Sequence, residues 1–148
     1  MDTQDALLVC AKDRAQDVKK LVEELNKKGC TEVKTPATVK KPWGSYTILD
    51  SGNNFLLKRI EVCPGESLSL QSHKHRSEHW TIAKGSAKVE LNEDTFNLEV
   101  NDSIIIPLNA KHRLGNPGSE VLIIFEIQFG DQLDENDIFR HEDLYGRD

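Results

Sequence analysis

The sequence lacks a cysteine framework, a long apolar run and a visible signal peptide. Its three cysteines, Cys10, Cys30 and Cys63, are an odd number with no Cys-x-x-Cys pair, which argues against disulfides and predicts reduced thiols. No apolar stretch approaches the length of a membrane-spanning helix, and no secretory signal is recognisable at the amino terminus. These absences predict a cytoplasmic protein without a membrane partner.

Basic residues are also in the minority. The chain has 19 basic and 25 acidic side chains, which gives a formal net charge of −6 at pH 7. This balance argues against nucleic acid as a general partner. A phosphorylated ligand would need cations gathered locally against the overall field. At 148 residues, the chain is long enough for one domain whose core needs no disulfide or structural metal to fold.

From residue 45 to residue 129, short strand-like runs alternate with turns rich in Asn, Asp, Gly and Pro. Strands at such regular spacing without intervening helices predict an antiparallel sandwich or barrel, and therefore an all-β fold. The predicted strands are 45–49, 54–62, 67–73, 78–83, 86–91, 95–100, 103–106, 112–115 and 121–128.

Three of the five histidines of the chain lie within seven residues: His73, His75 and His79. If the preceding residues form a strand, Gln71 and His73 share one face, because side chains alternate along a strand. A short turn then allows Glu78 to return to the same point. A second cluster, NDSIIIPLNAKHRLGN, places His112 shortly after an apolar strand and a proline turn. Both clusters put a histidine at a strand edge.

The spacing of these clusters resembles the two motifs of the cupin superfamily. The first motif matches at the positions Gly65, Gln71, His73, Glu78 and Gly85, with glutamine in place of the first histidine. The second matches at Asn101, Pro107, Asn109, His112 and Asn116. Asn101 and Asn109 replace glycines, and asparagine tolerates positive φ better than other non-glycine residues. The resemblance implies a double-stranded β-helix, or jelly-roll barrel.

In that register, the side chains of Gln71, His73, Glu78 and His112 form a metal site. Its mixed nitrogen and oxygen donors suit a divalent ion, zinc first, with cobalt, manganese, magnesium or iron as alternatives. A second register remains open, in which His73 and His75 form the paired ligands and His79 takes the place of the glutamate.

Three segments make the resemblance more specific, because they are similar to the carboxy-terminal domain of type II mannose-6-phosphate isomerases: LSLQSHKHRSEHW, KPWGSY and DIFRHEDLYGR. It implies metal-dependent interconversion of mannose 6-phosphate, a phosphorylated hexose, and fructose 6-phosphate for GDP-mannose supply. In that family a mannose-1-phosphate guanylyltransferase domain usually precedes this one, and its glycine-rich motif is absent here. Two alternatives are a non-catalytic sugar-binding or dimerising cupin, and an iron-dependent cupin dioxygenase.

Candidate groups for this chemistry follow from alternation and position. Aldose–ketose isomerisation needs a base that moves a proton between C2 and C1. The candidates are His75, expected on the side of His73, and Glu126 and Lys58, expected to face inward. Arginine suits a phosphate dianion, and Arg76 is the first choice. The further phosphate candidates are Arg140, Arg113 and Lys111.

We divide the chain into residues 1–40, a strand, helix and connector; 41–130, the barrel; and 131–148, a tail packed on the barrel. An apolar stripe predicts one N-terminal amphipathic helix that ends near Lys28, with Asp13 as its cap. A short strand is expected over residues 6–9, and Trp43 is expected to anchor the core. Residues 121–127 are apolar on both faces, which predicts a homodimer that covers one sheet.

Overall fold

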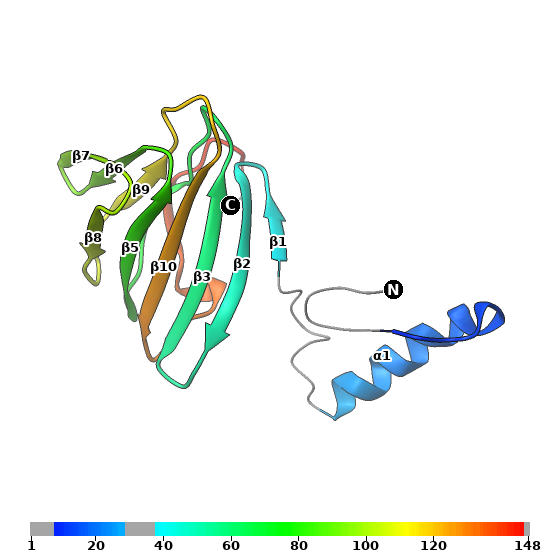
Figure 1. Cartoon of the computed structure of the whole chain (residues 1–148). Helices are drawn as coiled ribbons and strands as arrows, with labels where there is room; N and C mark the ends of the chain where they lie inside the picture. The colour runs from blue at the N-terminus through cyan, green and yellow to red at the C-terminus, as the bar shows by residue number, and fades with distance from the viewer. Residues whose placement is uncertain (1–7, 29–37, 147–148) are drawn as a thin grey trace. The chain divides into compact units, whose positions relative to one another are not determined.

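The computed structural model describes residues 8–28 and 38–146, and the chain divides into two units, Met1–Val39 and Lys40–Asp148. The first contains η1, a 3-10 helix at Lys12–Asp17, followed by the helix α1 at Val18–Lys27 (Figure 1). The amphipathic helix is therefore present. Its stripe is solvent-exposed at Leu21 and Val22. No helix in the described ranges is long and apolar enough to cross a membrane.

The start of this helix differs from the prediction. Asp13 lies inside η1 rather than at a cap, because a 3-10 turn precedes the α-helix. The residue that does precede α1, Asp17, makes no capping hydrogen bond with its side chain, which instead pairs with Arg14 and Lys20. Of the strand predicted over residues 6–9, only residues 8 and 9 are described, and they do not form one.

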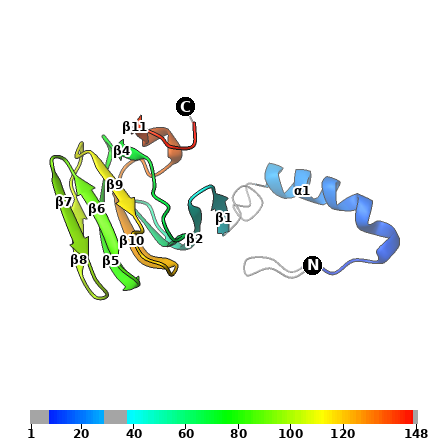
Figure 2. The same cartoon turned by 90° about the horizontal axis from the view of Figure 1, so that it is seen from above.

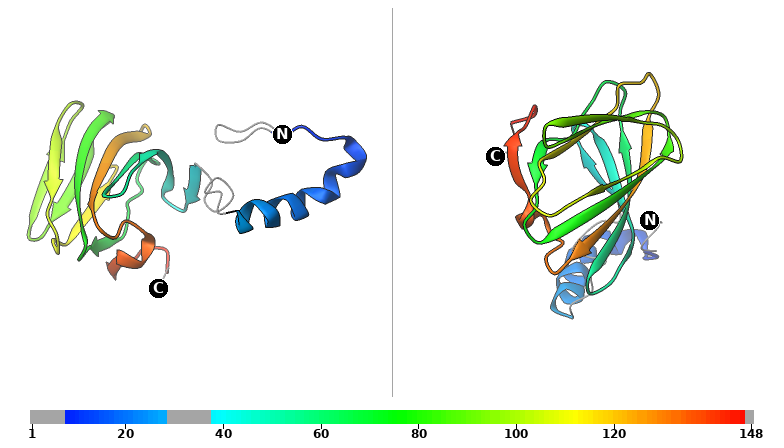
Figure 3. Two further views of the ribbon diagram at one scale, coloured as in Figure 1. Left: turned by 90° about the horizontal axis from the view of Figure 1, so that it is seen from below. Right: turned by 90° about the vertical axis from the view of Figure 1, so that its left-hand side faces the viewer.

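The second unit is built from β-strands in two antiparallel sheets. The six-stranded sheet has the order β1-β2-β3-β10-β5-β8, and the five-stranded sheet has the order β11-β4-β9-β6-β7. Figure 3 shows the two sheets facing each other across the interior of a barrel. The strands are β1 Thr38–Lys41, β2 Gly44–Ser51, β3 Phe55–Val62, β4 Leu70–Ser72, β5 Arg76–Lys84, β6 Ala87–Leu91, β7 Asp94–Leu98, β8 Ser103–Ile106, β9 His112–Gly115, β10 Leu122–Gly130 and β11 Phe139–Glu142.

Alternation along the central strands separates the core from the outer surface. On β10, Ile124, Glu126 and Gln128 are buried, while Phe125 and Phe129 are exposed on the opposite face. The inward orientation predicted for Glu126 is therefore confirmed. Trp43 is also buried in the apolar core, as predicted from the rigid turn that contains it.

Two further features bear on the site. The predicted strand over residues 67–73 is reduced to three residues of β4, which pairs with β9 at one position, Gln71 opposite His112. The tail is ordered: β11 pairs with β4 and lies beside it in Figure 2. Asn101 and Asn109 have φ of 76° and 64°, so the asparagines occupy the left-handed region that the motif requires at these turns.

Candidate metal centre

Three of the predicted ligands meet inside the barrel. His73 follows β4, Glu78 lies on β5 and His112 begins β9. One ligand atom from each lies within 4.8 Å of those of the other two, and all three residues are at most 2% exposed. Strand pairing accounts for the convergence, because β4 joins β9 in one sheet while Glu78 reaches inward from the other sheet.

Backbone carbonyl groups orient both imidazole rings. Nδ1 of His73 lies 2.9 Å from the carbonyl oxygen of Asp137, and Nδ1 of His112 lies 2.9 Å from that of Ala110. Since a carbonyl oxygen can only accept a hydrogen bond, each Nδ1 carries the proton. A neutral ring then presents a lone pair at Nε2, the arrangement typical of histidine ligands of metals.

These Nε2 atoms face the Glu78 carboxylate. Nε2 of His73 is 3.2 Å from Oε1, and Nε2 of His112 is 3.7 Å from Oε2. The His112 atom is buried and has no hydrogen-bond partner among the described residues. Burial lowers the pKa of His112, which favours the neutral ring. Lone pairs that face carboxylate oxygens are stabilised by a cation between them, so the donor set fits a divalent ion.

Glu78 is fixed by three further groups. Trp80 Nε1 donates to Oε2 at 3.1 Å, Gln128 Nε2 donates to Oε1 at 3.0 Å, and Arg76 Nε donates to Oε1 at 3.2 Å. Burial disfavours the charged form, but the contacts with His73 and His112 and the positive charge of Arg76 outweigh burial and hold the pKa of Glu78 well below its usual range. The carboxylate is therefore ionised and held in place.

Arg76 is part of this cluster rather than a surface cation. It is 2% exposed, its Nη1 donates to the carbonyl oxygen of Asp134 at 2.8 Å, and its Nη2 lies 3.4 Å from Nε2 of His73. The guanidinium thus joins the donor cluster to the tail.

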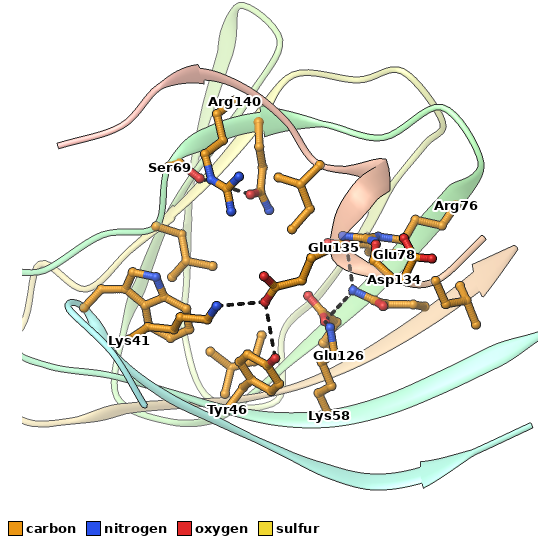
Figure 4. A pocket seen from close by; sticks show the side chains of 17 residues that line it. Lys41, Tyr46, Lys58, Ser69, Arg76, Glu78, Glu126, Asp134, Glu135 and Arg140 are labelled. Atoms are coloured by element: carbon orange, nitrogen blue, oxygen red, sulfur yellow. Dashed lines mark hydrogen bonds and ion pairs between the residues drawn. The ribbon is translucent and has the colours of Figure 1, made fainter. Parts of the chain in front are cut away.

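A pocket with about 580 Å³ of empty volume, part of it open to solvent, adjoins the cluster (Figure 4). Gln71, the fourth predicted ligand, lines the pocket, and its Oε1 accepts a hydrogen bond from Ser69 at 3.1 Å. The charged side chains of the lining are Lys41, Lys58, Arg76, Glu78, Glu126, Asp134, Glu135 and Arg140.

Glu126 is the second buried carboxylate in this pocket. It accepts hydrogen bonds from Trp80 at 3.1 Å and from Gln128 at 2.8 Å, and Lys58 Nζ lies 3.5 Å away. Burial and the neighbouring negative charge of Glu78 raise the pKa of Glu126 to about 7. A carboxyl group with such a pKa can both accept and return a proton near neutral pH.

The pocket brings together only some of the predicted catalytic and phosphate-binding groups. Lys58, Glu126, Arg76 and Arg140 line it. His75 does not: its side chain is half-exposed, and its Nδ1 is 3.6 Å from Asp131. The predicted alternation fails here because β4 ends at residue 72 and the chain turns before His75.

The other two phosphate candidates lie elsewhere. Arg113 lines a separate cavity and forms ion pairs with Glu90 and Glu142. Lys111 is exposed and lines neither cavity. The alternative ligand register is also not formed, because His79 is on the opposite face of β5 from Glu78.

Several important groups gave little signal in the sequence. Asp137 is 1% exposed, and its carboxylate accepts hydrogen bonds from the backbone N–H groups of Lys74 and His75 at 3.0 and 3.1 Å. Lys41, Tyr46 and Glu135 line the pocket. The sequence predicted that the tail packs on the barrel but did not indicate where, so the position of Glu135 beside Lys41 and Tyr46 was not predicted.

Two antiparallel sheets that enclose a His, Glu and His donor group define a cupin. The fold is similar to that of a *Lactobacillus farciminis* oxalate decarboxylase complex, with a TM-score of 0.61 at 24% identity over 70% of this chain and 33% of that one. More specifically, the chain belongs to the family described as mannose-6-phosphate isomerase C-terminal, whose sequence model matches residues 28–143. Residues 1–25 match a second family, described as MannoseP isomerase/GMP-like beta-helix domain.

Curated relatives are longer than this chain. The alginate biosynthesis protein AlgA of *Pseudomonas syringae* is 48% identical over 147 residues, which are 99% of this chain and 30% of the relative. The mannose-1-phosphate guanylyltransferase of *Escherichia coli* K12 is 44% identical over 99% of this chain and 31% of its own length. The chain thus spans about a third of these relatives.

Proposed function

We propose that this chain is a metal-dependent mannose-6-phosphate isomerase domain that interconverts mannose 6-phosphate and fructose 6-phosphate. The observation that carries the proposal is that Glu78 of the three-residue donor cluster lines the same pocket as Glu126, a carboxyl group with a pKa of about 7, and that basic side chains line this pocket as well. Family membership supports the same substrate class. The setting we propose is cytoplasmic synthesis of GDP-mannose, with a guanylyltransferase domain preceding this one in a longer protein.

His73, Glu78 and His112 would hold the divalent ion, with Gln71 as the fourth ligand. We expect zinc first, since the set mixes imidazole nitrogen with oxygen donors. Once bound, the ion would act as a Lewis acid that stabilises the oxygen charge of an enediolate.

We assign proton transfer to Glu126. In the forward direction, its carboxylate takes the proton from C2 and returns it to C1, while the hydroxyl proton on O2 moves to O1. Because its pKa is raised, the Glu126 side chain can take up the proton as a carboxylate and give it back as a carboxylic acid. Lys58, whose Nζ is 3.5 Å from Glu126, stabilises the ionised form and orients it.

A coupled assay of mannose 6-phosphate conversion tests the function on metal-stripped protein with Zn²⁺, Co²⁺, Mn²⁺ or Mg²⁺ added back. We expect a metal to restore turnover in the native chain, and His73→Ala to abolish both turnover and metal uptake. Glu126→Gln should keep metal uptake and lower kcat by at least about 100-fold. Lys111→Ala, outside the pocket, is the matched control. Absence of turnover with every metal, or full activity in His73→Ala, rejects the proposal.

A second candidate is a non-catalytic phosphosugar-binding domain. One observation favours it: the *E. coli* relative, 44% identical, has a name that describes only a guanylyltransferase. Binding of mannose 6-phosphate without turnover in the same assay would select this alternative. No observation favours the iron-dependent dioxygenase.

Homodimer formation stays a prediction. The outer face of the six-stranded sheet offers exposed apolar side chains for it, among them Ile105, Phe125 and Phe129. Light scattering after size-exclusion chromatography should give twice the chain mass, and Phe125→Lys should give a single chain. A monomeric native protein contradicts the prediction.

A further inference from the structure

A carboxylate from the tail occupies a ring of donors inside the pocket. Glu135 begins η3, the 3-10 turn Glu135–Asp137 between β10 and β11. Its Oε1 accepts a hydrogen bond from Lys41 Nζ at 2.8 Å and another from Tyr46 OH at 3.4 Å. Figure 4 shows Glu135 reaching into the middle of the pocket, with Arg140 pointing into the same space. The arrangement is that of an anion site filled from within the chain.

Lys41 and Tyr46, the two side chains that donate to Glu135, come from the barrel, whereas Arg140 lies on β11 of the tail. Lys41 ends β1, and Tyr46 lies on β2 opposite Ile60. The ring of Tyr46 contacts two cations, with Lys41 Nζ 5.8 Å and Lys58 Nζ 5.0 Å from its centroid. Such cation–π contacts hold the ammonium groups in place. Strand pairing and ring contacts therefore position the donors without help from Glu135.

The protonation states suit anion binding. Burial, followed by the negative charge of Glu135, raises the pKa of Tyr46 to about 12, so its hydroxyl keeps the proton that it donates. The hydrogen bond from Lys41 lowers the pKa of Glu135, and the positive charge of Arg140 acts in the same direction. The carboxylate at this position is therefore an ion that accepts hydrogen bonds from two side chains, with the Arg140 cation as a further favourable charge.

The contact of Glu135 with its donors is exposed and is therefore easily broken. The Glu135 side chain is 57% exposed, whereas Lys41 is 22% exposed. Exposed ion pairs contribute little to stability, so a more highly charged anion can displace this carboxylate at small cost. A phosphate dianion has more charge and more acceptor oxygens than a carboxylate.

We propose that Lys41, Tyr46 and Arg140 form the phosphate subsite of the pocket, and that Glu135 occupies this subsite until the phosphate of a sugar phosphate displaces it. The inference rests on the proposed function for the identity of the ligand. The subsite is also linked to the proposed base, because Tyr46 contacts Lys58, and Lys58 pairs with Glu126. Three of the four phosphate candidates from the sequence, Arg76, Arg113 and Lys111, are left out of this subsite.

Calorimetric titration of the full chain tests the subsite without any turnover. The probes are inorganic phosphate, mannose 6-phosphate and mannose. Lys41→Met, which keeps the aliphatic stem, should weaken binding of both phosphate probes by about tenfold or more, since it removes a charge-assisted hydrogen bond. Tyr46→Phe should weaken it by about threefold. Binding of mannose should change little in either variant.

The sharper variant is Glu135→Gln, which should bind both phosphate probes about threefold to tenfold more tightly, because the competing carboxylate is gone. A gain of affinity cannot come from a damaged fold, so this result stands even if Lys41→Met loosens the tail. Lys111→Met serves as the matched control and should leave affinity unchanged. Unchanged or weaker phosphate binding in Glu135→Gln overturns the proposal, as does unchanged binding in Lys41→Met.

The outcome is separable from that of the proposed function. Phosphate binding that responds to both variants, in a chain that turns over no sugar, supports the subsite and rejects the isomerase. Turnover of mannose 6-phosphate with an unchanged KM in both variants supports the isomerase and rejects the subsite.

Discussion

The two ends of the pocket are built in different ways. At the metal-site end, which Glu78 joins to the pocket, His73, Glu78 and His112 are almost fully buried, and Glu78 accepts hydrogen bonds from three side chains, those of Trp80, Gln128 and Arg76. At the tail end, Glu135 is largely exposed. The first end is a buried polar network around Glu78, in which Nε2 of His112 is left without a hydrogen-bond partner among the described residues, and the second is an exchangeable contact at the surface.

The buried end of the pocket is preorganised, whereas the exposed tail end can open to admit a ligand. A buried network cannot rearrange cheaply, because each polar group that loses its partner costs free energy. An exposed ion pair can open with little cost. The reacting end of a ligand would therefore meet fixed groups, while its charged end would meet a contact that it can replace. Mutations at the two ends should differ accordingly in their effect on stability.

The largest expected effect comes from Glu78→Ala. The substitution leaves the Arg76 guanidinium as a buried cation without its carboxylate, and it also removes one of the two carboxylates to which Trp80 and Gln128 donate, the other being Glu126. We expect the free energy of unfolding to fall by about 3–5 kcal/mol, measured by urea denaturation.

Glu142→Ala is its matched control. Glu142 pairs with Arg113 at 2.6 Å, but its own side chain is 65% exposed. Its loss should cost less than about 1 kcal/mol. Equal losses in the two variants would mean that the buried network is not the stabilising part of the site.

A smaller effect is expected at Asp137, where the two ends of the pocket are joined. Its carboxylate accepts the N–H groups of Lys74 and His75, and its carbonyl oxygen orients the His73 ring. Asp137→Ala leaves both N–H groups without their acceptor, so we expect a loss of about 2–3 kcal/mol.

The same variant should also release the tail. Hydrogen exchange followed by mass spectrometry should show faster exchange over β11 than over β10 in Asp137→Ala. Asp137→Asn keeps one acceptor oxygen and should recover part of the stability. Unchanged exchange over β11 would contradict the assignment of Asp137 as the link between tail and barrel.

Local pattern was enough to predict the barrel and the donor cluster. Alternation placed Glu126 inside, and motif spacing brought His73, Glu78 and His112 together, because both signals depend on the period of a strand. The prediction for His75 extended this period beyond the end of β4. A strand end of this kind is decided by tertiary contacts, here the carboxylate of Asp137, which binds the turn from 62 residues further along the chain.

The tail half of the site could not be predicted for the same reason. Lys41 and Glu135 are 94 residues apart, and each is an ordinary surface charge in the sequence. The pairing of β11 with β4 and the hydrogen bonds of Asp134 and Asp137 to the barrel hold the turn before β11 over the pocket. Arg76 shows the converse case: its place beside the cluster was predicted, but not its burial, because nothing local indicates that a guanidinium will be enclosed.

The smallest expected effect is the pH dependence of the tail contact. The pKa of Glu135 in the folded chain lies below its ordinary value of 4.5, mainly because of the hydrogen bond from Lys41. A group whose pKa is lower in the folded than in the unfolded chain stabilises the fold at pH values above its unfolded pKa. This stabilisation is lost as the pH falls through its folded pKa. The native chain should therefore be more stable than Glu135→Gln at pH 7, by less than about 1 kcal/mol because the pair is exposed, and the difference should shrink as the pH falls below 4.5. Urea denaturation of both proteins at several pH values measures it, with Glu93→Gln on the β6–β7 turn as control. A difference that does not shrink as the pH falls below 4.5 would show that the Glu135 side chain acts through packing rather than through its charge, and would remove the electrostatic contrast between the two ends of the pocket.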